Sequence, residues 1–420
     1  MTEAARPNTS FADTTLAHIV EMVRSRTALT RQELTDRTGL GRAVVRQRVD
    51  LAIDLGLAEE SGIGASTGGR GPRLLRFRSE SGRLALAALG PSRITVGVAD
   101  LQGEILGRHT VDWEISHGPS KTLDEIVRTL RSELRHVLDK PLWGVGVGLP
   151  GPVEYVSGRP VAPPIMPGWN GFDVRGHLAV ALDAPVWVDN DVNILALGER
   201  ERLMTPEADN FMYVKVGTGI GAGLVSNGRI HRGADGAAGD IGHIAVAGST
   251  TECRCGQIGC LEAIAGGWAL VRDATDAARA GRSDILAGFL QNTDDLTLEH
   301  ILQAMDAGDT YSTAAVAAAA STIGEALAST VSVFNPSLVI VGGDEVAFGE
   351  GFLARVREAV YRRSLPLATR NLQIVAPISD GHDGLRGAAA LAAHEIFSRT
   401  LPDWVAEGTP VATLLAAQLS

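Results

Sequence analysis

The sequence predicts an α/β protein that begins with a small, mainly helical domain, and three observations support this fold class. The chain has 420 residues, more than one hydrophobic core usually organises, so at least two domains are expected. Its hydrophobic fraction of 45% and charged fraction of 21% are typical of a globular protein. Strand-like apolar runs alternate with helix-like stretches after residue 84, whereas the first eighty residues have mainly helical periodicity.

The net charge of −11 is unevenly distributed along the chain. Residues 1–80 hold 12 Arg, no Lys and 10 acidic residues, a balance of +2, and the other 340 residues have a balance of −13. An acidic protein with such a first segment can still bind nucleic acid. The first residues lack a basic and apolar leader, and no run of eighteen apolar residues follows, so a cytoplasmic protein without a membrane span is expected.

The first eighty residues predict three helices and a two-stranded hairpin. Residues 14–26 place apolar side chains on one helical face, and residues 30–33 have the capping-box pattern that opens a second helix. A glycine turn at 39–41 precedes a basic third helix from Arg42, and residues 72–77 predict a strand after a Gly/Ser-rich tip at 61–71. The expected apolar underside of the third helix consists of Val45, Val49, Ile53 and Leu55 or Leu57.

This order of elements is typical of a winged helix-turn-helix that binds double-stranded DNA. The start of the third helix carries side chains able to reach phosphates and base edges in the major groove, and the hairpin tip carries arginines that suit a narrow minor groove. Taken alone, each of these arginines could equally be a solvated surface residue. Only the ordered series of helices, glycine turn and hairpin favours DNA binding. The predicted DNA contacts are Arg42, Arg46, Gln47, Arg48, Arg70 and Arg73.

The rest of the chain predicts a two-lobed α/β domain. Strands are expected at 94–99, 143–147, 186–188, 212–216 and 338–341. Glycine-rich turns follow strands at 90–92, 217–221 and 342–344. A single glycine turn often only reverses the chain, but three in this order resemble the phosphate and adenosine loops of the actin-like ATPase fold.

The three cysteines lie within eight residues, a spacing that favours a metal site over disulfides in a cytosolic protein. With His243, the thiols of Cys253, Cys255 and Cys260 make a tetrahedral Cys₃His set in which protein fills every position, as in structural Zn²⁺ sites. Glycines at 256 and 259 would shape a tight knuckle around the ion. The alternative is three cysteines without a ligand.

Successive motifs of this second part resemble those of the ROK family (repressors, open reading frames, kinases) from about residue 84 to 397. They are LPGP at 149–152, PGW at 167–169, VDNDVN at 188–193, GTGIG at 217–221, AGDIGH at 238–243 and CRCGQIGCLE at 253–262. A winged helix before such a domain is similar to the family's repressor branch, which senses sugars or sugar phosphates. The resemblance implies a DNA-binding head at 1–80, a ROK effector domain of two lobes at 82–400 and a tail at 401–420.

The resemblance also implies roles for single residues. In the family, the histidine at the place of His243 binds zinc through one nitrogen and sugar through the other. The residue at the place of Asp191 is the base that takes a proton from the sugar in the kinases, and capping of the helix predicted at 193–200 is its alternative role here. The expected effector-binding residues are Asn190, Asp191, Asp240, His243 and Glu262.

Several positions depart from the family pattern. Asp240 stands where the family has a longer Glu, and residues 164–166 stand where an Asn is common. Either the ligand is not glucose-like in its ordinary pose, or a water fills the gap at one sugar hydroxyl. In place of the kinase motif Asp-x-Gly-Gly-Thr-Lys, the chain has Ala88, which lacks the magnesium carboxylate, and Pro91, which lacks an N–H donor. Asp344 adds negative charge at the adenosine loop.

The sequence therefore predicts a transcriptional regulator that is no longer an enzyme, with Asp191 as a vestigial base. Its expected partners are operator DNA and a sugar or sugar-phosphate effector, and a homodimer or homotetramer would match an inverted-repeat operator. The alternative is an ATP-dependent sugar kinase with an appended DNA-binding domain, which the retained Asp191 and the intact loop at 217–221 favour. Repression and activation remain open, as do the effector, the operator and the role of residues 401–420.

Overall fold

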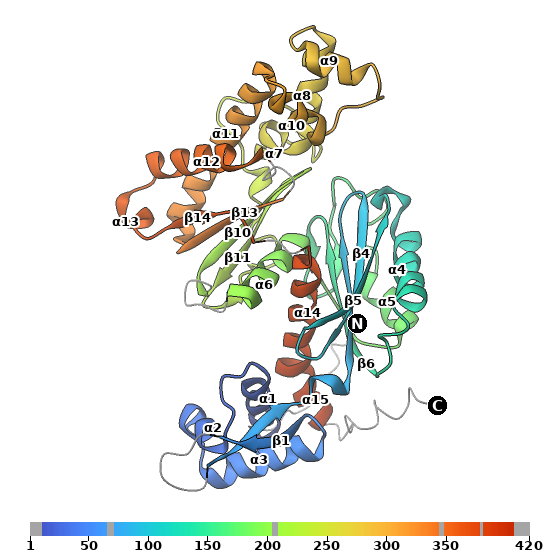
Figure 1. Ribbon diagram of the computed structural model, residues 1–420, viewed down its shortest axis with the longest axis vertical. Coiled ribbons are helices and arrows are strands. Elements are labelled where there is room, and N and C mark those ends of the chain that lie inside the picture. The colour runs from blue at the N-terminus through green and yellow to red at the C-terminus, as the bar shows by residue number, and fades with distance from the viewer. Residues whose placement is uncertain (1–10, 65–70, 204–208, 344–347, 379–380, 407–420) are drawn as a thin grey trace. The chain divides into compact units, whose positions relative to one another are not determined.

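The computed structural model describes residues 11–64, 71–203, 209–343, 348–378 and 381–406, and the chain divides into two compact units (Figure 1). Each unit contains a mixed sheet of five strands, and the first unit also contains the N-terminal head. The first unit consists of Met1–Gly148, Asp173–Val188 and Gly384–Ser420, and the second of Leu149–Phe172 and Asp189–Asp383.

The head has its helices and strands in the predicted order. α2 is opened by Thr30, whose side chain accepts from the Glu33 N–H while the Glu33 carboxylate accepts from the Thr30 N–H, which confirms the predicted capping box. α2 ends at Gly39, which has a left-handed φ of 69°. The elements are α1 (Phe11–Arg24), α2 (Arg31–Thr38), α3 (Arg42–Asp54) and the antiparallel strands β1 (Ala58–Ile63) and β2 (Arg73–Phe77).

The third helix buries the predicted side with one correction. Val45, Val49 and Ala52 are buried on α3, and Leu57 is buried just after it, whereas Ile53 is only half-buried. Positions 45, 49 and 52 follow the helical spacing i, i+4, i+7, and position 53 lies at the border of that face. The prediction of Ile53 as a core residue was therefore wrong, and alanine takes its place in the core.

The first five-stranded sheet has the order β5-β4-β3-β6-β9. β3 pairs antiparallel with β4 and parallel with β6, and β4 pairs antiparallel with β5. A helix crosses this sheet so closely that a Cβ atom on Gly146 would lie 2.1 Å from the carbonyl oxygen of Ala388. The strands are β3 (Arg83–Leu89), β4 (Arg93–Asp100), β5 (Ile105–Asp112), β6 (Leu142–Leu149) and β9 (Val186–Asn190), and the helices are η1 (Ser79–Ser81), η2 (Ile115–His117), α4 (Pro119–Glu133), α5 (Val174–Leu182) and α14 (Asp383–Glu395).

The second five-stranded sheet repeats this arrangement with the order β12-β11-β10-β13-β14. The central strands are β3 in the first sheet and β10 in the second. Each has an antiparallel neighbour that pairs with a further antiparallel strand on one side, and a parallel neighbour on the other. This repeated order confirms the predicted two-lobed actin-like architecture. The strands are β10 (Phe211–Val216), β11 (Ile220–Ser226), β12 (Arg229–Ile230), β13 (Leu338–Gly342) and β14 (Gln373–Val375), and a separate hairpin pairs β7 (Val153–Glu154) with β8 (Arg159–Pro160).

Helices cover both faces of the second sheet. One face packs against α6 through Ala196, and the other packs against a large core that includes Ile323, Leu327 and Val356. The helices of this unit are α6 (Asp191–Leu203), η4 (Ile241–His243), α7 (Leu261–Ala265), α8 (Gly267–Arg279), α9 (Asp284–Leu290), α10 (Leu298–Asp306), α11 (Thr310–Phe334), α12 (Glu350–Arg363) and α13 (Pro366–Thr369).

α11 is, among the described residues, the one helix that by length and composition is apolar enough to cross a membrane. It packs against α12, α7 and α10. Its Ile323, Leu327 and Val331 are fully buried in the core of the second unit. These contacts are those of a core helix, and its apolar character is accounted for by the protein interior.

The last described helices join the head to the first sheet. α14 continues through a π-helical turn, η6 (Ile396–Thr400), into α15 (Leu401–Ala406), and both η6 and α15 contact α1 of the head. The ring of Phe397 meets Phe77 of β2 edge-to-face at 5.3 Å, and Trp404 packs edge-to-face on Trp143 of β6. The segment after residue 400 therefore begins as a helix packed against the head.

Candidate functional site

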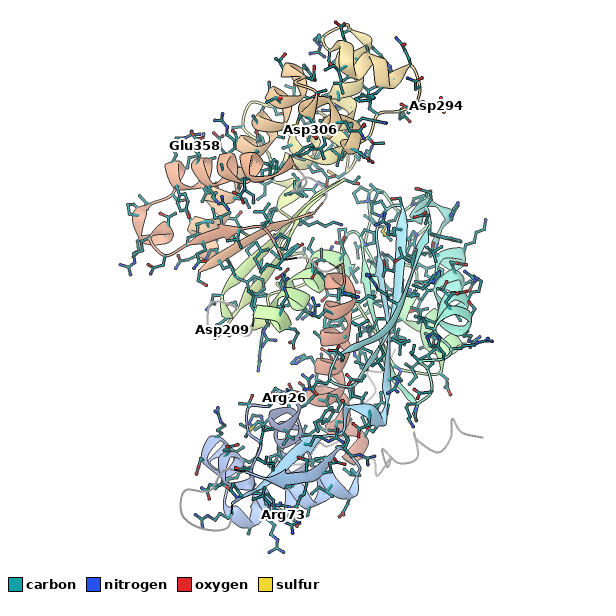
Figure 2. The ribbon with its side chains drawn as sticks, viewed as in Figure 1. Arg26, Arg73, Asp209, Asp294, Asp306 and Glu358 are labelled. Carbon is teal, nitrogen blue, oxygen red and sulfur yellow. The ribbon has the colours of Figure 1, made fainter. Side chains whose placement is uncertain are left out.

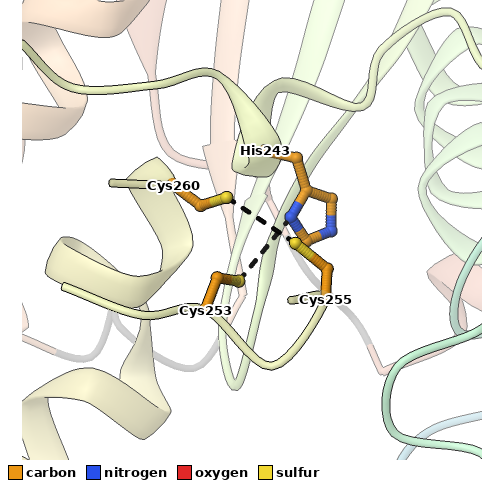
Figure 3. Close-up of side chains that lie close together, drawn as sticks. All are labelled: His243, Cys253, Cys255 and Cys260. Atoms are coloured by element: carbon orange, nitrogen blue, oxygen red, sulfur yellow. Dashed lines mark hydrogen bonds between the residues drawn. The ribbon is translucent and has the colours of Figure 1, made fainter. Parts of the chain in front are cut away.

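His243, Cys253, Cys255 and Cys260 come together as one cluster, with a ligand atom of each within 4.8 Å of the others (Figure 3). The Cys253 Sγ lies 3.8 Å from His243 Nδ1, and the Cys255 and Cys260 Sγ atoms are 3.7 Å apart. His243 ends η4 and Cys260 precedes α7, so two short helices hold two of the four donors. Left-handed backbone at Gly256 and Gly259 shapes the predicted knuckle between them.

The donors of this cluster fit a metal ion. Three thiol sulfurs and one imidazole nitrogen are a complete tetrahedral set for a borderline-soft divalent cation. Burial raises the pKa of the Cys260 thiol to about 12, so the thiolate needs a compensating positive charge. A bound cation supplies that charge, because metal binding and thiol deprotonation are coupled.

The ring of His243 has one edge toward the cysteines and the other toward a carboxylate. Nδ1 faces Cys253, and Nε2 lies 3.9 Å from Asp240 Oδ1. Asp240 is 45% exposed and His243 is 23% exposed, so both can reach a ligand in solution. A metal on Nδ1 would fix the ring and leave Nε2 available to a hydroxyl group.

Glu262 is buried and contacts the glycine loop that follows β10. Its Oε2 accepts from the Ile220 N–H at 3.3 Å, and a Cβ atom on Gly219 would lie 2.4 Å from that oxygen. Its Oε1 lies 3.9 Å from the Cys253 Sγ, and burial raises the pKa of Glu262. Glu262 thus links the cysteine cluster to the loop at 217–221, a connection that the sequence alone did not indicate.

Asn190 is held in place by two hydrogen bonds at the start of α6. Its Nδ2 donates to the Gly151 carbonyl at 2.7 Å, and its Oδ1 accepts from the Val192 N–H at 2.9 Å. The side chain that satisfies this free N–H of the first turn is therefore Asn190 and not Asp191.

Asp191 has a partner that sequence reasoning missed. Its Oδ2 lies 2.6 Å from the Nζ of Lys215 on β10, and both side chains are partly buried. Lys215 is one of only three lysines in the chain and occupies the interior of an apolar strand. That unusual position was the available signal, although it does not identify the partner.

The carboxylate of Asp189 is a second group that sequence reasoning missed, and it helps to hold Asn190 in place. The buried Asp189 carboxylate accepts from the Asn190 N–H, from the Asn193 side chain and from Arg232, whose guanidinium lies 2.7 Å away. Arg232 also stacks on the ring of Tyr155 at 3.7 Å. The predicted effector residues therefore fall into two groups, one around the cysteine cluster and one at the start of α6.

Two of the three predicted glycine-rich turns lie within the described residues and occur where predicted, whereas the third, at 342–344, extends beyond them. Residues 90–92 connect β3 to β4, and residues 217–219 connect β10 to β11. The carbonyls of Gly217 and Thr218 accept from the N–H groups of Gly267 and Trp268, at the start of α8. Ala88 lies in β3, where a Cβ atom on Gly384 would approach it to 2.9 Å. Asp344 lies outside the described residues.

The predicted DNA contacts lie mainly on the outer side of α3. Arg42 and Gln47 are exposed, Arg46 is 79% exposed, and Arg48 is half-buried. Arg73, 62% exposed, extends from the start of β2 (Figure 2). Arg70 lies outside the described residues. The groove along α3 is lined by Arg42, Ala43, Arg46, Gln47, Arg48, Asp50, Leu51 and Asp54.

Two actin-like lobes with a winged helix-turn-helix ahead of them define a class of protein, the regulators built on a sugar-kinase fold. Residues 87–395 match the ROK family model, and the chain belongs to the ROK family. The match covers the second sheet, the first sheet except the start of β3, the cysteine cluster and the start of α6.

Similar proteins include both regulators and kinases. The xylose repressor of Caldicellulosiruptor bescii is 29% identical over 358 residues, which cover 85% of this chain and 89% of the repressor. A glucokinase of Halalkalibacterium halodurans is 31% identical over 281 residues, which cover 66% of this chain and 85% of the kinase. A crystal structure of a ROK family transcriptional regulator, a homologue of the Escherichia coli Mlc protein, covers 96% of this chain and 99% of its own, with a TM-score of 0.78 at 22% identity.

The coverage of these matches separates the two groups. The regulator structure has the fold of nearly the whole chain, head included, whereas the glucokinase leaves a third of the chain unmatched. The xylose repressor also matches most of the chain, 85% of it. With that match, the organisation is that of a ROK transcriptional repressor.

Proposed function

We propose that this chain binds operator DNA through its head and represses transcription until a sugar or sugar-derived effector binds the second unit. The observation that carries the proposal is the row of exposed polar side chains on α3, in a chain whose second unit places a carboxylate and an imidazole beside a cysteine cluster. Similarity to a xylose repressor supports this reading. We assign DNA contacts to Arg42, Arg46, Gln47, Arg48, Arg70 and Arg73.

The metal in this proposal is Zn²⁺ with a structural role. His243, Cys253, Cys255 and Cys260 would hold it, and the set leaves no position open for water. Its chemical contribution would be to fix the imidazole of His243, while Asn190, Asp191, Asp240, His243 and Glu262 bind hydroxyl groups of the effector. This set suits a polyol, because carboxylates accept hydrogen bonds from hydroxyl groups and an imidazole and an amide donate hydrogen bonds to them.

The proposal includes no catalysis. Ala88 carries no carboxylate for magnesium and Pro91 no N–H for phosphate. Lys215 engages the carboxylate of Asp191, which competes with proton transfer from a sugar hydroxyl to that carboxylate. The similarity to a glucokinase favours the competing function, an ATP-dependent sugar kinase with a DNA-binding head. ADP release with any sugar, abolished by Asp191→Asn, would establish the kinase instead.

Repression would depend on the coupling of two binding events. A homodimer or homotetramer in the cytoplasm would place two heads, each within residues 1–80, on the half-sites of an inverted repeat. An effector bound within residues 82–400 changes operator affinity only if it prefers one conformation of the protein.

The experiment is a gel-shift titration of purified protein on operator DNA with a panel of sugars and sugar phosphates. Release of DNA by one compound is the expected result. Equal DNA affinity with every compound would overturn effector control, and no affinity for any duplex would overturn DNA binding.

A further inference from the structure

Five charged side chains of the head form one continuous relay of ion pairs. Arg31, in the first turn of α2, donates from Nη2 to Asp50 Oδ1 at 2.8 Å and from Nη1 to Glu60 Oε1 at 2.6 Å. The second oxygen of each carboxylate faces another arginine: Asp50 Oδ2 lies 3.7 Å from Arg46 Nε, and Glu60 Oε2 accepts from Arg73 Nη1. One guanidinium therefore connects the outer side of α3 to the base of the wing hairpin.

The relay is sheltered at its centre and exposed at its ends. Arg31 and Glu60 are 31% and 25% exposed, whereas Arg46 and Arg73 are 79% and 62% exposed. Hydrogen bonds from Arg31 and Arg73 hold the pKa of Glu60 below its usual range, so the Glu60 carboxylate stays ionised at neutral pH. With three arginines and two carboxylates, the relay keeps one net positive charge at its outer ends.

Fold stability alone is a poor explanation for this arrangement. Exposed ion pairs add little to the free energy of folding, because both partners are well solvated when apart. Their orienting effect is larger, because a planar guanidinium that makes two directed hydrogen bonds has one preferred pose. What the relay fixes directly is therefore the pose of Arg31 and of the two carboxylates, whose second oxygens face Arg46 and Arg73.

We propose that Arg31 is a positioning residue that sets Arg46 and Arg73 at one spacing, so that Arg46 reads a guanine in the major groove. Asp50 faces the Nε side of Arg46 and leaves the two terminal Nη groups as a fork of donors. Guanine is the base that presents two acceptors, O6 and N7, at its major-groove edge. This inference rests on the proposed DNA-binding function and deepens it by naming the base that is read.

The test uses the full-length protein and a randomised duplex library from which bound sites are selected. Affinity is then measured for the best site, for versions in which each guanine of a half-site is replaced, and for an unrelated duplex. Arg31→Lys keeps the positive charge but loses the planar guanidinium that binds two carboxylates at once. It should therefore lower the preference for one guanine about tenfold, while affinity for the unrelated duplex changes less than about twofold.

Two further variants separate positioning from folding and from charge. Asp50→Asn leaves the pair between Arg31 and Glu60 intact and should lose the same guanine preference in a folded protein. Arg37→Lys, at an exposed position near the end of the same helix, is the matched control and should keep the preference.

The outcomes distinguish this inference from the function on which it rests. If the wild type enriches no sequence and binds no duplex, the proposed function fails. If it enriches a site but Arg31→Lys and Asp50→Asn keep the full preference, or weaken all duplexes equally, the positioning role is overturned.

Discussion

At the scale of single residues, the pair of Lys215 and Asp191 changes the interpretation of the start of α6. The sequence marks Asp191 as a vestigial base or a helix cap, whereas in the structure its carboxylate accepts from a lysine 24 positions away. Asn190 provides the cap. The carboxylate is thus charge-balanced before any ligand arrives.

Lys215→Met is expected to lower the free energy of unfolding by about 1 kcal/mol, because it leaves a partly buried carboxylate without its cation. The double variant Lys215→Met/Asp191→Asn should recover part of that loss, because it also removes the stranded charge. Urea unfolding of the four proteins in this cycle measures the coupling. Strictly additive effects would show that the pair does not interact in solution.

Gly219→Ala is expected to weaken effector binding about tenfold or more, because the new methyl group would displace the carboxylate of Glu262. Titration calorimetry with the effector found in the gel-shift panel measures the change. Gly288→Ala is the matched control, because a Cβ atom there meets nothing within 4 Å. Equal affinities of the wild type and Gly219→Ala would remove Glu262 from the effector site.

The sequence predicted which residues form the cysteine cluster but not the partners of the acidic residues. Three cysteines and a histidine at this spacing suit few roles other than metal binding, so His243, Cys253, Cys255 and Cys260 were identifiable from chemistry and resemblance. Lys215, Arg232 and Arg31 meet their partners through strand pairing and helix packing. No local pattern encodes such contacts.

At the scale of elements, helix caps and strands were predictable because their signals are local. The capping box of α2 and the glycine turns after β3 and β10 lie at the predicted residues. α1 begins at Phe11, three residues before the apolar periodicity starts. The helix after residue 400 was missed because its partners, α1 and Trp143, lie far away in sequence.

Asp309→Asn tests the cap of α11 across pH. Although burial raises the pKa of Asp309, hydrogen bonds from the Ser312 hydroxyl and N–H hold it below the usual value. A depressed pKa stabilises the fold above the unfolded-state pKa, and this contribution is lost as pH falls through the folded-state pKa. The wild type should therefore exceed Asp309→Asn by about 1 kcal/mol at pH 7.

That difference should begin to shrink below about pH 4, where Asp309 becomes protonated in the unfolded chain, and should be lost only as the pH falls through the lower folded-state pKa. Urea unfolding at several pH values follows it, and the comparison cancels effects that the two proteins share, including metal release in acid. A difference that stays constant down to pH 3 would show that the charge of Asp309 contributes nothing.

At the scale of the whole molecule, the cysteine cluster and the head lie in different units. A substitution that disrupts the cluster should therefore leave DNA binding by the head intact. Cys255→Ser is expected to lose the bound metal and the effector response while operator affinity is kept. Metal analysis, gel shifts and thermal unfolding check the three parts of this outcome. Gln257→Ala, in the same knuckle but without a ligand role, is the control. Simultaneous loss of DNA binding would mean that the metal supports the entire fold.

Effector and operator must influence each other equally if repression works by linkage. An effector that lowers operator affinity by a given factor should itself bind more weakly by that factor in the presence of operator DNA. It should also raise the melting temperature of the free protein, because a ligand present at 100 times its Kd adds about 2.7 kcal/mol to the native state. Release of DNA by a compound that leaves the melting temperature unchanged would contradict direct binding.

The scarcity of lysine gives the proposed effector site a chemical reporter. Lys121 and Lys140 are exposed on the first unit, and Lys215 is the third and last side-chain amine of the chain. An amine-reactive label should therefore modify the two surface lysines quickly and Lys215 slowly. Any small molecule that seats beside Asp191 should slow that third modification further, which mass spectrometry can follow peptide by peptide without a radioactive or fluorescent effector.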